Sequence, residues 1–231
     1  MPIRALLLDA GGTLLTEEPA REVIYADHAR ARGLEVSPAR MKECMGRAHA
    51  ALPQVLDGHF RYSLPWFERF IDHIFAGQLG LPAGEVPALR RELFAAFADP
   101  RSFRLLPGAA LLLEQASARG LPMALVSNWS PAMEGVLDGL GVSRHFSTRL
   151  ISALEGVEKP DPEIFRRALA RLNVPAAQAL HVGNEPVQDV LGASACGIRT
   201  LLFDPHDRHR DLPHPRIGAL REVIPWIESQ P

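Results

Sequence analysis

Polar side chains of the kinds that perform chemistry stand at four points along this chain of 231 residues. The first is Asp9, which ends the apolar run of residues 3–8. The others follow at wide intervals: Ser127 with Asn128, then Lys159, and finally Asn184 with Asp189. A carboxylate can carry a phosphoryl group covalently, and cations balance the charge that spreads over the transferred group. These residue types therefore suit phosphoryl transfer, provided that the fold brings the four points together.

The elements around these points predict such a fold. Continuous apolar runs, typical of parallel strands buried on both faces, cover residues 3–8, 122–128, 148–152, 179–184 and 199–203. Helical patterns separate them at residues 107–120, 130–141, 161–173 and 186–197. Strands that alternate with helices predict an α/β fold, with a parallel sheet covered by helices on both faces. Ligands of such sheets bind outside the carboxyl ends of the strands, where the polar residues stand.

Several residues mark where these helices begin and end. Ser130 before Pro131 and Asp161 before Pro162 are each typical of an N-cap followed by proline in the first turn. Glycines are typical of helix C-termini, and we expect such stops at Gly120, Gly141 and Gly197.

A different pattern fills residues 17–104. Helical periodicity is present around residues 20–33, 37–52, 63–80 and 85–99, with no convincing strand. The sequence therefore predicts a helical cap domain at 17–104, inserted into a core domain formed by 1–16 and 105–231. Aromatic and aliphatic residues at helical spacing are expected to form the core of the cap, with Trp66 or Phe60 as candidates to face a substrate.

Four motifs in this order resemble those of the haloacid dehalogenase-like superfamily of hydrolases. They are "DAGGTL" at Asp9, "VSN" ending at Asn128, "EKPDPEIF" around Lys159 and "HVGNEPVQD" ending at Asp189. The predicted cap also stands where the subgroup with a helical-bundle cap carries that cap. The resemblance implies a Rossmann-like core and hydrolysis of a small phosphorylated molecule.

The resemblance also implies a role for each motif residue. Asp9 would be the nucleophile that becomes an aspartyl-phosphate, and Lys159 would balance charge between nucleophile and phosphate. The substrate-binding residues would be Gly11, Gly12, Thr13, Ser127 and the amide of Asn128. A magnesium ion would be held by the Asp9 carboxylate, the main-chain carbonyl of Gly11, Asn184 and Asp189.

Two positions depart from the family pattern. Gly11 stands where most phosphatases of this superfamily have an aspartate that protonates the leaving oxygen, a contribution of about 10² to 10⁴ in rate. Candidates to replace it are Glu17, Glu18, a cap residue or an ordered water in the space that the missing side chain leaves. Acyl and aryl phosphates, which have good leaving groups, need the acid least.

The second departure is Asn184, at a position where the family has a metal-binding aspartate. Its carbonyl oxygen can coordinate magnesium, but one negative charge is missing, which predicts weaker binding. Glu185 is a candidate to compensate.

Two alternatives follow from these departures. One is a metal-independent hydrolase in which Asp9 attacks carbon, as in the dehalogenases of the superfamily, although those carry a tyrosine at the position of Gly11. The other is a member that binds a phosphorylated ligand or a protein partner and catalyses little.

The composition limits the other possibilities. The formal net charge of −2 argues against a nucleic-acid partner. No apolar run approaches the ~20 residues of a membrane span, and a first strand that begins by residue 3 leaves no room for a signal peptide. Cys44 and Cys196 fall in different predicted units, so we expect free thiols and a cytoplasmic protein. No oligomeric state is predicted.

Overall fold

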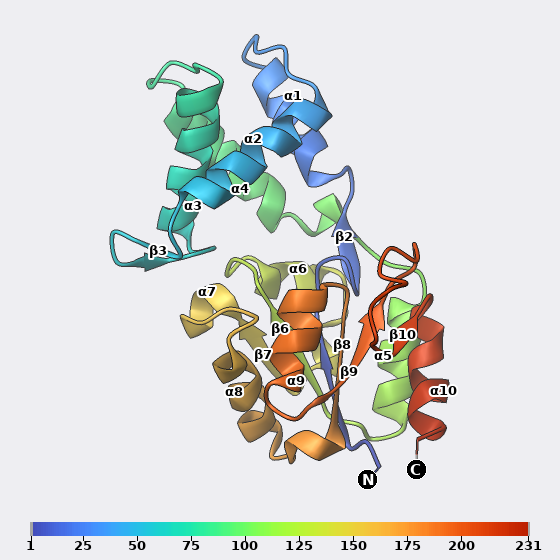
Figure 1. Ribbon diagram of the computed structural model, residues 1–231. Coiled ribbons are helices and arrows are strands. Elements are labelled where there is room, and N and C mark those ends of the chain that lie inside the picture. Colours follow the sequence, from blue (N-terminus) through green and yellow to red (C-terminus); the bar gives the residue numbers. More distant parts are fainter. Residues whose placement is uncertain (1, 231) are drawn as a thin grey trace.

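A six-stranded sheet lies at the centre of the core in the computed structural model, which describes residues 2–230 (Figure 1). Its order is β10-β9-β8-β1-β6-β7, and every pair of neighbours is parallel. The strands are β1 (Ala5–Leu8), β6 (Met123–Ser127), β7 (Thr148–Ile151), β8 (Ala179–Gly183), β9 (Arg199–Phe203) and β10 (Arg216–Ile217). The predicted α/β fold class and the five predicted strands are confirmed, while the two-residue β10 was not predicted.

The register of the central strands aligns their carboxyl ends. Leu8 pairs with Leu125 of β6 on one side and with Val182 of β8 on the other. The next residue, Asp9, continues this alignment because its main-chain N–H donates to Val182 O over 3.0 Å. Three of the four polar points therefore begin at the same level of the sheet.

Helices cover both faces of the sheet. Alternate residues of β1 point to opposite sides and are buried by different helices. Leu6 and Leu8 belong to the same buried cluster as α5 (Ala109–Ala118), α6 (Met133–Gly139) and α10 (Val223–Glu228). Leu7 packs on the other face with α8 (Pro162–Leu172) and α9 (Gly192–Ser194). Between β8 and α9 the chain forms a π-helical turn, Pro186–Leu191, within the helix predicted at 186–197. A four-residue helix, α7 (Ser152–Glu155), follows β7.

The predicted helix ends are correct with one exception. Asp161 caps α8 by accepting a hydrogen bond from Glu163 N over 2.9 Å. The three predicted stop glycines, Gly120, Gly141 and Gly197, have positive φ, as a left-handed C-terminal residue requires. The prediction that Ser130 caps a helix is wrong, because α6 begins only at Met133. Pro131 and Ala132 instead form a turn in which Met133 N donates to Ser130 O over 3.2 Å.

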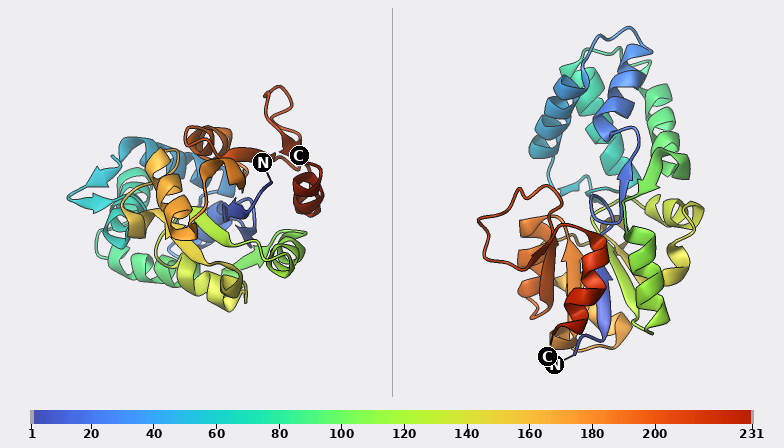
Figure 2. Two further views of the ribbon diagram at one scale, coloured as in Figure 1. Left: turned by 90° about the horizontal axis from the view of Figure 1, so that it is seen from below. Right: turned by 90° about the vertical axis from the view of Figure 1, so that its right-hand side faces the viewer.

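Residues between β2 (Leu15–Glu17) and β5 (Phe103–Leu105) form a helical layer over the carboxyl end of the sheet (Figures 1 and 2). These two strands pair antiparallel and carry the chain to the cap and back. The cap helices have their own apolar core, built around Phe70, Ile71 and Phe75. They are α1 (Arg21–Arg30), α2 (Pro38–Ala51), α3 (Leu64–Asp72) with a π-helical extension His73–Gln78, and α4 (Val86–Ala98).

The cap also contains a short hairpin that the sequence did not predict, formed by β3 (Val55–Leu56) and β4 (His59–Phe60). Its two turn residues, Asp57 and Gly58, both have positive φ, as a tight two-residue hairpin turn requires. Strands of two residues carry too little alternation to be detected from their sequence.

Among residues 2–230 the chain forms no helix whose length and hydrophobicity would carry it through a bilayer. Cys44 in the cap and Cys196 in the core are both free thiols, which confirms the expectation of no disulfide between them.

Candidate active site

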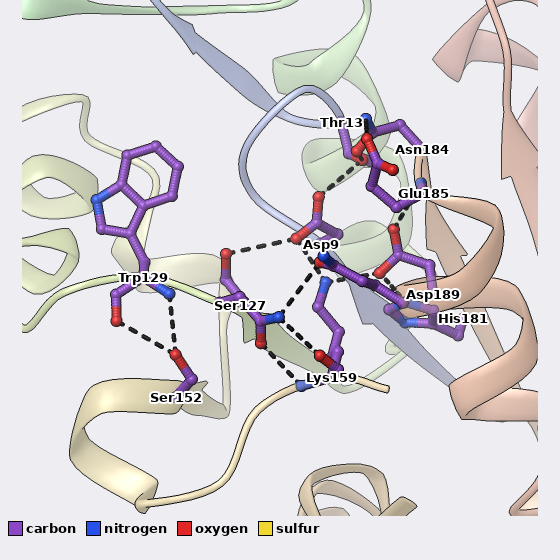
Figure 3. Close-up of polar contacts among 12 residues, drawn as sticks. Asp9, Thr13, Ser127, Trp129, Ser152, Lys159, His181, Asn184, Glu185 and Asp189 are labelled. Carbon is purple, nitrogen blue, oxygen red and sulfur yellow. Dashed lines mark hydrogen bonds and ion pairs between the residues drawn. The ribbon is translucent and has the colours of Figure 1, made fainter. Parts of the chain in front are cut away.

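Asp9 is the centre of a buried polar cluster at the carboxyl ends of β1, β6 and β8 (Figure 3). Its Oδ1 accepts hydrogen bonds from Lys159 Nζ over 2.7 Å and from Ser127 Oγ over 3.4 Å. Its Oδ2 accepts one from Thr13 Oγ1 over 3.0 Å. The two oxygens therefore face different partners, with the predicted phosphate-binding serine and lysine on one side and the turn after β1 on the other.

Lys159 joins two buried carboxylates. Its Nζ lies 2.7 Å from Asp9 Oδ1 and 2.6 Å from Asp189 Oδ1, and only 3% of the residue is exposed. Burial opposes the charge on Lys159, but the two carboxylates outweigh it and raise the pKa of the ammonium group. Lys159 is therefore a fixed positive charge between the nucleophile position and the fourth motif.

Asp189 is held from three sides. Besides Lys159, His181 Nε2 donates to its Oδ1 over 3.0 Å, and the main-chain N–H of Glu185 donates to its Oδ2 over 2.9 Å. Burial opposes ionisation here too, but Lys159 and His181 prevail and hold the pKa of Asp189 below its ordinary value. Gly183 makes this arrangement possible, because a Cβ at that position would lie 2.2 Å from Asp189 Cγ. Neither His181 nor Gly183 was singled out from the sequence, although both stand in the fourth motif.

Asn128 connects the second motif to the third. Its Oδ1 accepts from Lys159 N over 2.8 Å, and its Nδ2 donates to Lys159 O over 2.9 Å and to Gln188 Oε1 over 3.2 Å. The side chain thus fixes the main chain on both sides of the Lys159 Cα. The sequence had suggested a role only for the Asn128 amide, since nothing in a single motif shows which partner a side chain finds.

The predicted metal ligands come together in part. Thr13 Oγ1 lies 3.0 Å from Asp9 Oδ2 and 3.1 Å from Asn184 Oδ1, so oxygens from the first and fourth motifs face one point. Gly12 leaves room for this approach, because its φ is +77° and a Cβ there would lie 2.8 Å from Asn184 Nδ2. Oxygen ligands at this point suit magnesium. Asp189 joins the group only through Lys159, since its own oxygens are engaged as described above.

Comparison with known proteins identifies the family. The family model described as haloacid dehalogenase-like hydrolase matches residues 3–197. The chain belongs to this family. It is therefore a hydrolase, as its four motifs predicted.

Relatives of this hydrolase cover nearly its whole length. The phosphoserine phosphatase of Thermus thermophilus is 36% identical over 96% of this chain and 98% of its own length. The haloacid dehalogenase-like hydrolase domain-containing protein 3 of Danio rerio is 33% identical over 97% of this chain and 96% of its own. Relatives over this length include a phosphatase by name.

Solved structures share the fold. The HAD-hydrolase YfnB of Bacillus subtilis superposes with a TM-score of 0.78 at 18% identity. The superposition covers 99% of this chain and 100% of the YfnB chain. The 2-haloacid dehalogenase of Pseudomonas syringae gives a TM-score of 0.68 at 24% identity, covering 98% of each chain. At these identities the likeness extends to the fold alone.

In this haloacid dehalogenase-like hydrolase, the position of the usual acid is covered by an aromatic ring. A Cβ added to Gly11 would lie 2.6 Å from Trp129 Cζ3, well inside van der Waals contact. The indole packs edge-on against Phe103, with ring centroids 5.9 Å apart, and the Arg21 guanidinium lies 5.2 Å from its ring centroid. An edge of the Trp129 indole therefore lies against the position where a side chain at residue 11 would begin, which narrows the space suggested for an ordered water. Trp129 directly follows the second motif but carries no motif signal of its own.

The two glutamates suggested as replacement acids are engaged elsewhere. Glu17 Oε1 accepts from Arg21 Nε over 2.9 Å, and Glu18 Oε2 lies 2.7 Å from Arg104 Nε. Within residues 2–230 neither carboxylate hydrogen-bonds to the Asp9 cluster. Glu185 lies closer, and its Oε1 accepts from Asn184 Nδ2 over 3.2 Å, which orients the Asn184 carbonyl oxygen toward Thr13.

Proposed function

We propose that this hydrolase is a magnesium-dependent phosphatase that acts on a small phosphorylated molecule through an aspartyl-phosphate at Asp9. The observation that carries the proposal is the position of Lys159 Nζ, within 2.7 Å of Asp9 and buried beside Asp189. A buried ammonium next to a carboxylate nucleophile supplies positive charge to the oxygens of a transferring phosphoryl group. The phosphatase name of the Thermus thermophilus relative supports the same class of substrate.

The two oxygens of Asp9 suggest separate tasks. Oδ1 faces Ser127 and Lys159, so it is the oxygen that would attack phosphorus. The new Oδ1–P bond forms as the bond from phosphorus to the leaving oxygen breaks, and the leaving group departs with the electron pair. Water then attacks phosphorus and the Oδ1–P bond breaks, which releases inorganic phosphate and restores Asp9.

The charges of the site favour a divalent cation. Asp9, Asp189 and Lys159 together carry a net charge of −1 when ionised, which would repel a phosphate dianion. Asp9 Oδ2, the Gly11 carbonyl and Asn184 Oδ1 would hold magnesium. Asp189, the fourth ligand that the family resemblance implies, would reach the ion only if one of its oxygens exchanged its present partner. When bound, the ion supplies positive charge opposite the phosphoryl oxygens. With Asn184 in place of a carboxylate, its affinity should be low.

The proposal is tested with acetyl phosphate, a small substrate with a good leaving group. Release of phosphate is measured with and without magnesium, for the unchanged protein and for Asp9→Asn. The matched control is Asp27→Asn, which removes a carboxylate from an exposed ion pair in the cap. Turnover should require both magnesium and Asp9 and should be unchanged in the control.

Other outcomes would favour the alternatives. Metal-independent halide release from 2-chloropropionate would identify a dehalogenase in which Asp9 attacks carbon. Binding of beryllium fluoride or phosphate without turnover of any phosphate ester would identify a binding protein.

A further inference from the structure

A cavity of about 470 Å³ lies between the cap and the carboxyl end of β6. On the core side it is lined by the loop that starts at Asn128 and Trp129, directly after Ser127. On the cap side, residues of α1, α2, α3 and α4 enclose it. The cavity therefore begins next to Ser127, the proposed phosphate-binding residue, and is the space next to it that we consider for a leaving group.

Aromatic rings form much of the cavity wall. They come from the three cap helices α1, α3 and α4, from the segment before α3 and from the core loop, and they include Tyr62, Phe67, Phe70, Phe94, Phe97 and Trp129. Several of them already contact one another edge to face, as Phe67 does with Phe70 at a centroid distance of 5.9 Å. Such a wall binds an aromatic guest through burial of apolar surface and through ring contacts.

The charged and titratable side chains Arg21 and His49 of the wall each have a partner. Arg21 forms an ion pair with Glu17. His49 Nε2 lies 3.3 Å from the Tyr62 hydroxyl, and burial together with the nearby Arg61 and Arg21 lowers the pKa of the His49 imidazole. A charged leaving group would lose its hydration here without a free counter-charge to replace it.

Trp129 links the cavity to the chemistry. Its ring is part of the cavity wall, and one edge of it stands where a side chain at position 11 would begin. The leaving oxygen therefore meets an indole in place of a carboxylic acid and must depart without a proton from that side. A phenol ionises with a pKa of about 10, whereas the hydroxyl of water has a pKa of about 15.7, so an aryl oxide leaves far more easily than an alkoxide.

We infer that the substrate of this site is an aryl phosphate monoester, whose ring system occupies the cavity while its phosphate lies at Asp9. This inference rests on the proposed phosphatase function. Benzene fills a cavity of roughly 150 Å³, so a space of about 470 Å³ accommodates two fused rings as well as one. An aryl phosphate would explain both features: it needs no acid at position 11, and its ring would bind to the aromatic wall.

The test compares kcat/KM for a panel of phosphates that separate fit from leaving-group quality. Phenyl and 1-naphthyl phosphate have both features, cyclohexyl phosphate fits but leaves poorly, and acetyl phosphate leaves well but is small. Phosphoserine represents a charged alkyl substrate. We expect 1-naphthyl and phenyl phosphate to exceed both cyclohexyl phosphate and phosphoserine by at least about a hundredfold.

Variants test where the ring binds. Phe67→Leu and Phe94→Leu reduce the aromatic wall on two different helices, and each should lower the ratio of kcat/KM for phenyl phosphate to that for acetyl phosphate by about tenfold. Leu111→Ala, an exposed position on α5 outside the cavity, should leave this ratio unchanged. Using a ratio within each variant removes any general loss of active protein.

Binding without turnover gives an independent measurement. Benzylphosphonate and methylphosphonate carry the same non-hydrolysable head group, and Trp66 and Trp129 in the wall report binding through their fluorescence. Benzylphosphonate should bind at least about tenfold more tightly. Equal affinities, or a preference for phosphoserine over phenyl phosphate, would overturn the inference while leaving the phosphatase proposal intact if acetyl phosphate is hydrolysed. Failure to hydrolyse any member of the panel would instead contradict the proposed function.

Discussion

The core site and the cap cavity lie side by side but are built by opposite means. In the core, charged and polar side chains hold one another at hydrogen-bond distances, and Asp9, Lys159 and Asp189 are all buried. Across the interface the cap presents rings, and the charge it brings, Arg21, is already paired. From this contrast we expect the core residues to define the reaction and the cavity to define which leaving group the reaction accepts. Asn128 and Trp129 belong to both regions, since Asn128 binds the main chain of Lys159 and Trp129 stands over Gly11.

Removing the ammonium group of Lys159 should disrupt the core site most severely. In Lys159→Met, Asp9 and Asp189 lose the ammonium group between them, which leaves two buried carboxylates uncompensated. Breaking a buried charge cluster in this way costs about 3–5 kcal/mol in the free energy of unfolding. Loss of a cation at the transferring phosphoryl group should also lower kcat for acetyl phosphate about 10² to 10³-fold. Urea denaturation and phosphate release measure the two effects.

The chain supplies its own control, because Lys42 is the single other lysine in the sequence. Its side chain is 77% exposed and lies 4.0 Å from Glu22. Lys42→Met should change the free energy of unfolding by under about 1 kcal/mol and leave kcat unaltered. If the unfolding curves of Lys159→Met and Lys42→Met coincide, the contacts of Lys159 with Asp9 and Asp189 do not stabilise the fold.

The boundary between the core site and the cavity is tested by placing an aspartate at position 11 and removing the indole ring at position 129. Gly11→Asp alone places Cβ 2.6 Å from the indole of Trp129, so it should destabilise the fold by about 1–3 kcal/mol without raising the rate. Combined with Trp129→Ser, the same aspartate has room and can protonate a leaving alkoxide. The double variant should then hydrolyse cyclohexyl phosphate about ten to a hundred times faster than the unchanged protein.

Trp129→Ser by itself serves as the control for this exchange, since it opens the space without supplying an acid. It should lower the turnover of phenyl phosphate and leave that of cyclohexyl phosphate slow. A rate increase in Gly11→Asp with Trp129 still present would show that the ring does not keep an acid out.

The sequence predicted the core better than the cap, for physical reasons. Parallel strands are buried on both faces, so β1 and β8 appear as apolar runs, and the polar residues that close them mark the binding edge. The side-chain pairing of Asn128 with the main chain of Lys159 could not be predicted, because it joins residues 31 positions apart. The same holds for Trp129 over Gly11, since the ring belongs to a loop whose course only the packed structure defines. The expected Ser130 cap failed because a proline turn delays the helix that follows it.

The magnesium ligands offer a smaller test within the core. Asn184→Asp adds a carboxylate where Oδ1 already lies 3.1 Å from Thr13 Oγ1, on the same side as Asp9 Oδ2. An added negative ligand should lower the magnesium concentration for half-maximal activity about tenfold. The measurement is acetyl phosphate turnover in a magnesium titration, with Asp27→Asn again as the surface control. An unchanged midpoint would place the ion away from Asn184.

The smallest effect is expected at Glu158, the residue before Lys159, where the core touches the cap. Its Oε1 accepts from Gln54 Nε2 over 3.0 Å and lies 3.3 Å from Arg61 Nη1, both from segments flanking the β3–β4 hairpin. Its Oε2 is buried with no hydrogen-bond partner. Burial therefore raises the pKa of Glu158, and Arg61 and Gln54 offset this only in part.

A raised pKa has a defined sign in stability. The folded state holds the proton of Glu158 at a pH where the unfolded chain has released it, so stability falls as pH rises from the ordinary carboxyl range through the raised pKa. Glu158→Gln removes this dependence. Relative to the variant, the unchanged protein should gain stability between pH 7 and pH 5, by under about 1 kcal/mol because Arg61 already compensates much of the charge. Urea denaturation across this range measures it, with the exposed Glu43→Gln as the matched loss of a carboxylate. The opposite slope would mean that Arg61 dominates Glu158, and that the contact between cap and core is a satisfied ion pair like those of the core site.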